Sequence, residues 1–339
     1  MLSNLVGLLE LYRVDPDDRF LSACKNAWKD IATQRLYITG TASYYEQFTP
    51  DHRLPPGVAV GEGCVTVTWL QLTTHLLELT GEVQYADELE RTTYNALLAA
   101  QSPHTGEVTY FVPLTGHKGY NDHDYKLTPP ISCCSSSIPR GIAMIPAFAS
   151  GTLNGKPALL QYIPGRHGLH HRGGVTRTNV VLHVRGDYPE TGEIEIEVEL
   201  EKATRFPLVL RVPAWAEGFE ATVDGTVYKP SRGRLLEIER TWSPRDTVRV
   251  RIPLEIRIVP DGDKTTKSYA FVRGPQVLAS DAAVEASGGI PKSGWWGDAL
   301  YTGTFRHDGV EKEFQFVSFA DAGQNKEEYA VLHEGIEAS

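Results

Sequence analysis

The chain has 339 residues, a formal net charge of −10 and 22% charged side chains. This length is enough for two or three domains, and the composition is that of a globular protein with its own hydrophobic core. Phosphate binding needs clustered Lys and Arg, so the evenly mixed acidic charge excludes nucleic acid as the main partner. No stretch approaches the roughly 18 consecutive apolar residues of a membrane span, and we expect no membrane association.

The compartment is inferred from the N-terminus and the cysteines. The stretch MLSNLVGLLELYRVDPDD has no Lys or Arg before its short apolar run, unlike a secretion signal. The four cysteines, Cys24, Cys64, Cys133 and Cys134, are too few for a disulfide framework in a chain of this length. We therefore expect reduced thiols and a cytoplasmic protein.

Apolar residues at spacings of three and four predict a helical first part of the chain. The predicted helices cover residues 2–14, 17–36, 65–79 and 82–101, with one more after Cys133 and Cys134. Gly81 follows the third of these helices, where a left-handed residue is favoured. Consecutive helices with short links indicate an array of helical hairpins, which we assign to a domain of residues 1–152.

A period of two replaces this pattern from about residue 157. In GEIEIEVEL (192–200), Ile194, Ile196, Val198 and Leu200 share one face and glutamates the other. Similar runs cover 206–215, 246–258 and 269–280, separated by Gly, Pro and Asp turns. We expect an antiparallel β-sandwich over 153–260 and a β-rich segment over 261–339 that completes or extends it. The fold class is multidomain α+β. The histidine-rich run 165–171 is interpreted as a turn entering the sandwich.

The adjacent Cys133 and Cys134 precede a predicted helix, whose unpaired N–H groups stabilise thiolates. In this interpretation Ser135, Ser136 and Ser137 are helix caps, and Pro139 lies in the first turn. Glu62 and Cys64 also lie just before a helix. Since zinc takes four Cys, His or carboxylate ligands, these four residues could form one tetrahedral site. Their spacing matches no zinc-finger pattern, and in the alternative Cys64 is a core residue and the pair is incidental.

These residues lie within a wider resemblance. The segments YYEQF, GEGCVTVTWLQLTTHLLELTGEVQYADELERTTYNALLAAQ and VTYFVPLTGHKGY, followed by the Cys-Cys pair, resemble glycoside hydrolase family 127. The strands FPLVLRVPAWAEGFEATVDG and YAFVRGPQVLA are similar to the β-domains of that β-L-arabinofuranosidase group. The resemblance extends over most of residues 40–325 and implies part of an (α/α)6 barrel followed by β-sandwich domains.

The resemblance also implies roles for individual residues. It implies a Zn²⁺ ion held by Glu62, Cys64, Cys133 and Cys134. Cys133 would be the nucleophile and Glu46 the general acid/base of a retaining glycosidase. The substrate would be a furanoside or a related glycoside.

Other side chains are weaker candidates for a sugar pocket. His117, Tyr120 and His123 could line it, or they could be solvated loop residues. Tyr44, Tyr45 and Phe48 could form an apolar wall around Glu46, or could be ordinary core aromatics. For Trp295 and Trp296, a loop anchor is favoured over stacking on sugars.

Two features depart from the family pattern. The sequence predicts five or six helices before the strands, whereas an (α/α)6 barrel has about twelve. We therefore expect a homo-oligomer or a partner chain that completes the barrel, since an open half barrel would expose a large apolar surface. The chain also has SSSIPRG after the cysteines, where the family has Pro-Pro-Asn, which affects the expected sugar specificity more than the reaction type.

Two alternative functions remain open from the sequence. The chain could be a non-catalytic carbohydrate-binding or scaffold subunit, with a structural zinc site and a partner chain that supplies activity. A thiol redox protein is disfavoured, because that chemistry usually uses Cys-x-x-Cys between a strand and a helix.

Overall fold

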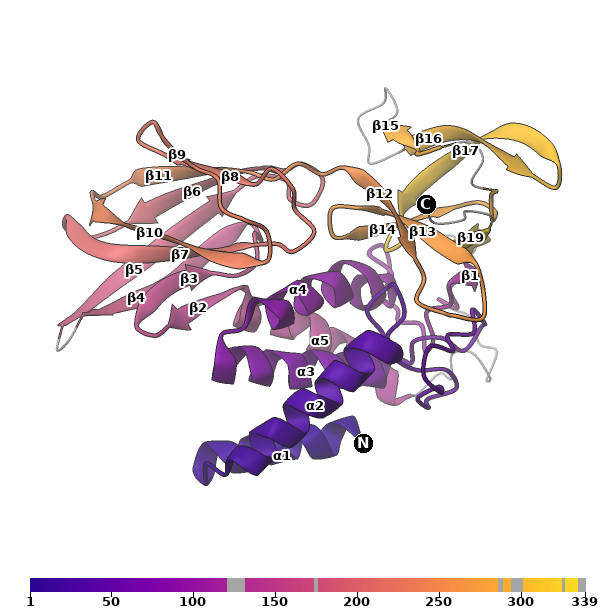
Figure 1. Cartoon of the computed structure of the whole chain (residues 1–339), viewed down its shortest axis with the longest axis horizontal. Helices are drawn as coiled ribbons and strands as arrows, with labels where there is room; N and C mark the ends of the chain where they lie inside the picture. Colours follow the sequence, from indigo (N-terminus) through magenta and orange to yellow (C-terminus); the bar gives the residue numbers. More distant parts are fainter. Residues whose placement is uncertain (121–131, 174–175, 286–288, 294–300, 325–326, 335–339) are drawn as a thin grey trace. The chain divides into compact units, whose positions relative to one another are not determined.

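The structure, a computed structural model, describes residues 1–120, 132–173, 176–285, 289–293, 301–324 and 327–334 (Figure 1). The chain divides into two compact units, each built from segments distant in sequence. The first comprises Met1–Leu76, Glu88–Ala143 and Ile256–Ser339, and the second comprises Leu77–Asp87 and Met144–Glu255. These units are defined by compactness in space and not as continuous stretches of sequence. They therefore do not test the domain boundaries predicted after residues 152 and 260, which stay predictions.

Five α-helices lie in the described part of the chain, all within its first 149 residues. They are α1 (Leu2–Val14), α2 (Asp18–Gln34), α3 (Gly63–Thr80), α4 (Val83–Thr92) and α5 (Cys133–Ala149), with a π-helical turn, η1 (Thr93–Leu97), after α4. No helix among the described residues has the length and apolar content to cross a membrane. The predicted fold class is confirmed: a helical first part is followed by largely antiparallel sheets.

The first three predicted helices agree with the structure to within a residue or two at each end. Gly81 ends α3 with φ +67°, and its N–H donates to the Leu77 carbonyl at 2.8 Å. The expected single helix over 82–101 widens instead into η1, where the Asn95 side chain donates to the Arg91 carbonyl within the helix and also reaches the backbone of Pro275 and Val277. Its amide donates to the Pro275 carbonyl at 2.9 Å and accepts from the Val277 N–H at 2.7 Å. This exchange ties η1 to the sheet of the first unit.

The first unit contains a nine-stranded sheet. Its strands are β1 (Thr115–Gly116), β12 (Ile256–Pro260), β13 (Ser268–Arg273), β14 (Gln276–Ser280), β15 (Lys292–Ser293), β16 (Tyr301–His307), β17 (Val310–Ser318), β18 (Tyr329–Ala330) and β19 (His333–Glu334). Phe271, Phe305 and Phe316 form the centre of its aromatic core, with ring centroids 5.3–5.5 Å apart. The short β1 joins the segment before the cysteine pair to this sheet, because Thr115 pairs with Ala330.

The second unit is a sandwich of two sheets that lie face to face (Figure 1). One sheet has the order β10-β7-β3-β2 and the other β4-β5-β6-β11-β8-β9. The strands are β2 (Ser150–Leu153), β3 (Lys156–Leu159), β4 (Gly165–Gly173), β5 (Thr176–Arg185), β6 (Glu193–Glu199), β7 (Thr204–Val212), β8 (Glu220–Val223), β9 (Thr226–Tyr228), β10 (Arg234–Trp242) and β11 (Asp246–Arg251). All recorded strand pairs are antiparallel except β3 with β7.

The period-two pattern sets the faces of this sandwich. Ile194, Ile196 and Val198 of β6 are buried as predicted, while the glutamates between them face outward. The turn predicted for the histidine-rich run 165–171 is wrong, because these residues form strand β4. His171 of β4 stacks on Phe206 of the facing sheet at 5.7 Å, and His167 bonds Ser150 and the Ile163 carbonyl. His167 and His171 are therefore held by packing and hydrogen bonds within the sandwich.

Candidate metal centre and active site

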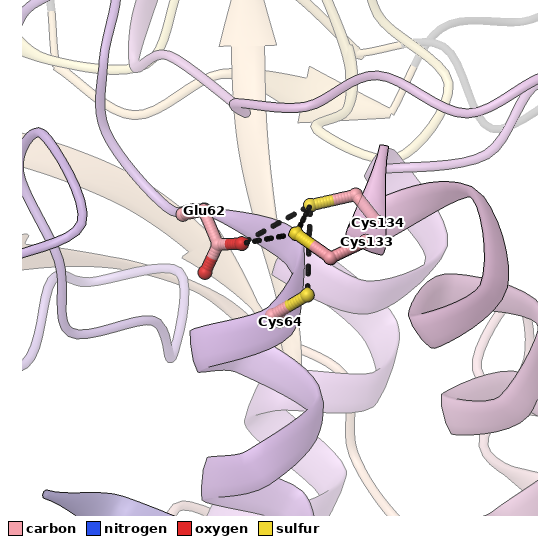
Figure 2. Close-up of side chains that lie close together, drawn as sticks. All are labelled: Glu62, Cys64, Cys133 and Cys134. Carbon is pink, nitrogen blue, oxygen red and sulfur yellow. Dashed lines mark hydrogen bonds between the residues drawn. The ribbon is translucent and has the colours of Figure 1, made fainter. Parts of the chain in front are cut away.

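The N-termini of α3 and α5 bring four potential ligands together (Figure 2). Glu62 directly precedes α3, Cys64 is the second residue of that helix, and Cys133 and Cys134 are the first two residues of α5. The expectation that this helix starts after the cysteines is wrong. Ser132 is the residue before it, and its hydroxyl accepts the Ser135 N–H at 3.3 Å. Pro139 is consequently the seventh residue of α5, beyond its first turn.

Glu62 has two distinct contacts through its two carboxylate oxygens. Oε2 accepts the N–H of Val65 at 2.7 Å and so caps α3. Oε1 faces the sulfurs, 3.2 Å from Cys134 Sγ and 3.5 Å from Cys133 Sγ. The residue is 4% exposed, and its own N–H donates to the Ser43 hydroxyl. The cap therefore fixes the direction in which the second oxygen points.

Glycine at position 63 allows the two helix starts to approach. A Cβ there would lie 2.7 Å from Ile138 Cδ1 and 3.1 Å from Cys134 Sγ. One turn further along α5, a Cβ on Gly141 would lie 2.6 Å from Val67 Cγ2 of α3. A larger residue at these positions would force the contacting side chains, among them Cys134 at position 63, to shift.

The distances fit a tetrahedral zinc ion. Cys134 Sγ lies 3.9 Å from Cys64 Sγ and 4.0 Å from Cys133 Sγ, and all four ligand atoms lie within 4.8 Å of one another. Tetrahedral zinc with usual bond lengths would place two sulfurs about 3.8 Å apart and a sulfur and an oxygen about 3.6 Å apart. A disulfide would need about 2.05 Å. Among the described residues, this is the one group recorded with three or more metal-ligand side chains.

The charge state of the group depends on whether a cation is bound. Burial raises the pKa of the Cys64 thiol to about 12. Burial and the adjacent Glu62 carboxylate raise the pKa of Cys134 well above its ordinary value. Without a cation these thiols stay protonated, and the Cys134 thiol donates to the Glu62 carboxylate while the Cys64 thiol donates to the Ser137 hydroxyl. A bound divalent metal would favour the thiolates instead. The Ser137 hydroxyl, expected to cap the helix, lies 3.2 Å from Cys64 Sγ.

Tyr110 connects this group to Glu46. Its hydroxyl donates to Glu46 Oε1 at 2.5 Å and lies 3.8 Å from Cys133 Sγ. Burial, followed by the Glu46 and Cys133 contacts, raises the pKa of Tyr110, so the phenol keeps its proton. Sequence reasoning missed Tyr110, because its partners lie 64 and 23 residues away and no local spacing marks them.

The remaining candidate residues have other surroundings. Tyr120 is 2% exposed, and its hydroxyl donates to the Ala99 carbonyl. His117 is exposed. Their substrate-binding role stays a prediction. His123, Trp295 and Trp296 lie outside the described residues. Cys24 is fully buried in α2, separate from the other cysteines, and its thiol donates to the Leu5 carbonyl.

Comparisons with known proteins identify the family of the chain. Residues 2–147 match the β-L-arabinofuranosidase catalytic domain of glycoside hydrolase family 127, and residues 158–254 match the middle domain of that family. The chain is 27% identical over 296 residues to a non-reducing end β-L-arabinofuranosidase of Bifidobacterium longum subsp. longum. That alignment covers 81% of this chain and 42% of the relative, so the chain spans less than half of the relative's length.

Two solved structures share the fold. One is a family 127 β-L-arabinofuranosidase from Geobacillus stearothermophilus T6, with a TM-score of 0.84 and 20% identity, covering 99% of this chain and 60% of that one. The other, a family 127 β-arabinofuranosidase, has the same TM-score and identity, and 59% of its chain is covered. With part of the catalytic domain and the middle domain matched, the chain belongs to glycoside hydrolase family 127.

Proposed function

We propose that the protein is a retaining glycoside hydrolase of the β-L-arabinofuranosidase type, with Cys133 as nucleophile and Glu46 as general acid/base. One observation carries the proposal. A single hydroxyl, that of Tyr110, contacts both the Glu46 carboxylate and the Cys133 sulfur, and that sulfur belongs to the metal-ligand group. An acid and a nucleophile held across one small gap are what glycoside cleavage requires.

The separation of these two groups favours retention. Tyr110 Oη lies 2.5 Å from Glu46 Oε1 and 3.8 Å from Cys133 Sγ, so the two atoms are no farther apart than the sum of these lengths, about 6.3 Å. Inverting enzymes need roughly 6.5–9.5 Å between their two groups to admit a water molecule, whereas retaining enzymes have about 5–5.5 Å. This upper limit on the separation of the two atoms lies below the range of inverting enzymes, which supports direct attack by Cys133.

We infer that the resident metal is zinc, bound by Glu62, Cys64, Cys133 and Cys134. Bound there, it supplies positive charge that keeps the nucleophilic sulfur ionised at neutral pH. The first turn of α5 adds backbone N–H groups near the same sulfur. Glu62 holds its orientation through the α3 cap.

The reaction proceeds in two displacements. Cys133 Sγ attacks the anomeric carbon, the bond to the leaving oxygen breaks, and Glu46 gives that oxygen its proton. Water then attacks the same carbon, Glu46 takes a proton from the water, and the carbon–sulfur bond breaks to restore the thiolate. Two inversions give net retention. The Tyr110 hydroxyl donates to Glu46 and so positions its carboxyl group near Cys133.

The substrate class follows from the relatives named above, whose names describe removal of β-L-arabinofuranose, in one case from a non-reducing end. The chain has SSSIPRG after the cysteines, where the family has Pro-Pro-Asn. The proposal therefore covers the class of substrate and not the identity of the sugar. The cytoplasmic location, and the second copy or partner chain that completes the barrel, likewise stay predictions.

Metal content tests the site independently of activity. We expect about one zinc ion per chain by elemental analysis, because three thiolates and a carboxylate form a complete ligand set. Cys64→Ser should lose most of the zinc, since a neutral hydroxyl is a poor ligand. Cys24→Ser is the matched control and should keep it, because Cys24 lies outside the group. Equal zinc content in both variants would contradict the assigned ligands.

Loss of the nucleophile tests the reaction. Cys133→Ser should lower kcat on a β-L-arabinofuranoside by at least about 10⁴-fold, the usual scale for removing a covalent nucleophile. Circular dichroism should show that folding is intact. Cys24→Ser should retain turnover. A folded Cys133→Ser chain that hydrolyses at the wild-type rate would exclude the mechanism. Absence of turnover in the wild type, with sugar binding retained, would favour the non-catalytic subunit.

The role of Glu46 predicts a dependence on the leaving group. Glu46→Gln should lose about 10²–10⁴-fold in kcat/KM on an alkyl glycoside, whose oxygen needs a proton to leave. The loss should be much smaller for a nitrophenyl glycoside, whose leaving group is stable as an anion. Gln47→Ala, an exposed residue in the same turn, is the control. Equal losses on both substrates would show that Glu46 is not the general acid.

A further inference from the structure

Glu46 lies in a tight turn whose other central residue, Tyr45, is unusual for the backbone conformation that it adopts. Tyr44 and Gln47 exchange both backbone hydrogen bonds, at 3.0 and 3.2 Å, which makes a two-residue hairpin turn. Its central residues, Tyr45 and Glu46, have φ of +48° and +64°. Positive φ at both positions matches the type I′ turn, which usually takes Asn-Gly. Neither tyrosine nor glutamate favours that conformation.

The proposed chemistry accounts for only one of the two strained residues. The strain at Glu46 is explained by its carboxylate, which the turn directs to the Tyr110 hydroxyl. Position 45 could hold asparagine or glycine, which would keep the same turn with less strain. An aromatic side chain at this position therefore needs a reason of its own, and strained residues concentrate at functional sites.

The Tyr45 ring is both exposed and supported. It meets Tyr44 at 4.9 Å and 81°, and Phe111 at 6.5 Å and 67°, both edge-to-face arrangements. Phe111 in turn meets Tyr110 at 4.8 Å, so the ring belongs to the aromatic group that borders Glu46 and Cys133. Yet Tyr45 is 60% exposed. The interpretation as an ordinary core aromatic is therefore wrong for Tyr45. Aromatic neighbours hold the ring while leaving much of it open to a ligand.

The chemistry of Glu46 identifies which part of a ligand lies nearby. A general acid must contact the leaving oxygen, so the group released from the sugar lies on the Glu46 side of the bond, opposite the attacking Cys133. Tyr45 is the neighbour of Glu46 in a two-residue turn. We propose that Tyr45 is the stacking platform for a ring-shaped leaving group, a sugar or an aromatic residue, and so determines specificity on that side. The inference rests on the proposed function.

The test compares two substrates whose leaving alcohols have similar acidity, methyl and benzyl β-L-arabinofuranoside. The leaving group of the benzyl glycoside has a ring and that of the methyl glycoside has none, so the ratio of their kcat/KM values measures recognition of the ring. Tyr45→Gly removes the side chain and suits the positive φ, which avoids a folding defect. Tyr45→Phe keeps the ring, and Gln47→Ala is the control in the same turn.

We expect the benzyl-to-methyl ratio to fall about three- to tenfold in Tyr45→Gly, the size of one aromatic contact. It should stay within about twofold of wild type in Tyr45→Phe and Gln47→Ala. An unchanged ratio in Tyr45→Gly overturns the proposal. If the wild type hydrolyses neither glycoside, the proposed function is contradicted on its own. In that case the affinity for the benzyl glycoside, measured by calorimetry, tests the role of Tyr45. A three- to tenfold lower affinity in Tyr45→Gly than in the wild type supports the stacking platform. Equal affinity in the two proteins overturns it.

Discussion

The rest of the site depends on one electrostatic constraint: three sulfurs and a carboxylate oxygen lie within 4.8 Å of one another. As anions they would repel strongly, and without a cation burial keeps the thiols of Cys64 and Cys134 protonated. A bound divalent metal would remove the repulsion between the anions and would let the sulfurs stay as thiolates. The group is therefore suited to a metal ion.

The fold meets this constraint with two helix starts. Glu62 caps α3 with one oxygen and faces the sulfurs with the other, and α5 begins at the cysteine pair itself. Gly63 and Gly141 let the two helices approach closely enough for the ligand distances. The acid/base candidate comes from a separate element, a strained hairpin turn, and Tyr110 connects it to the sulfur. The two helix starts therefore supply the metal ligands, the turn supplies the Glu46 carboxyl group, and Tyr110 joins the two.

Much of this fold could be predicted from local patterns. Periodicity located the helices at 2–14 and 65–79 and the buried face of β6, because burial on one face leaves a regular trace in the sequence. The four ligands were grouped from their residue types at two predicted helix starts, although their spacing fits no general zinc pattern, and the family resemblance then implied the same set. Local reasoning was wrong where tertiary contacts decide. It placed a turn at β4, whose histidines pack within the sandwich, and put Pro139 in the first turn of a helix that begins earlier. Tyr110 and the left-handed turn at Tyr45 had no local signature.

The proposed attack of Cys133 on the sugar can be trapped chemically. The zinc-loaded protein would be reacted with an arabinofuranose analogue that carries an epoxide at the reactive carbon, and the adduct would be mapped by peptide mass spectrometry. We expect one sugar adduct per chain, on the sulfur of Cys133. An adduct on a carboxylate such as Glu62 or Glu46, with Cys133 unmodified, would contradict it.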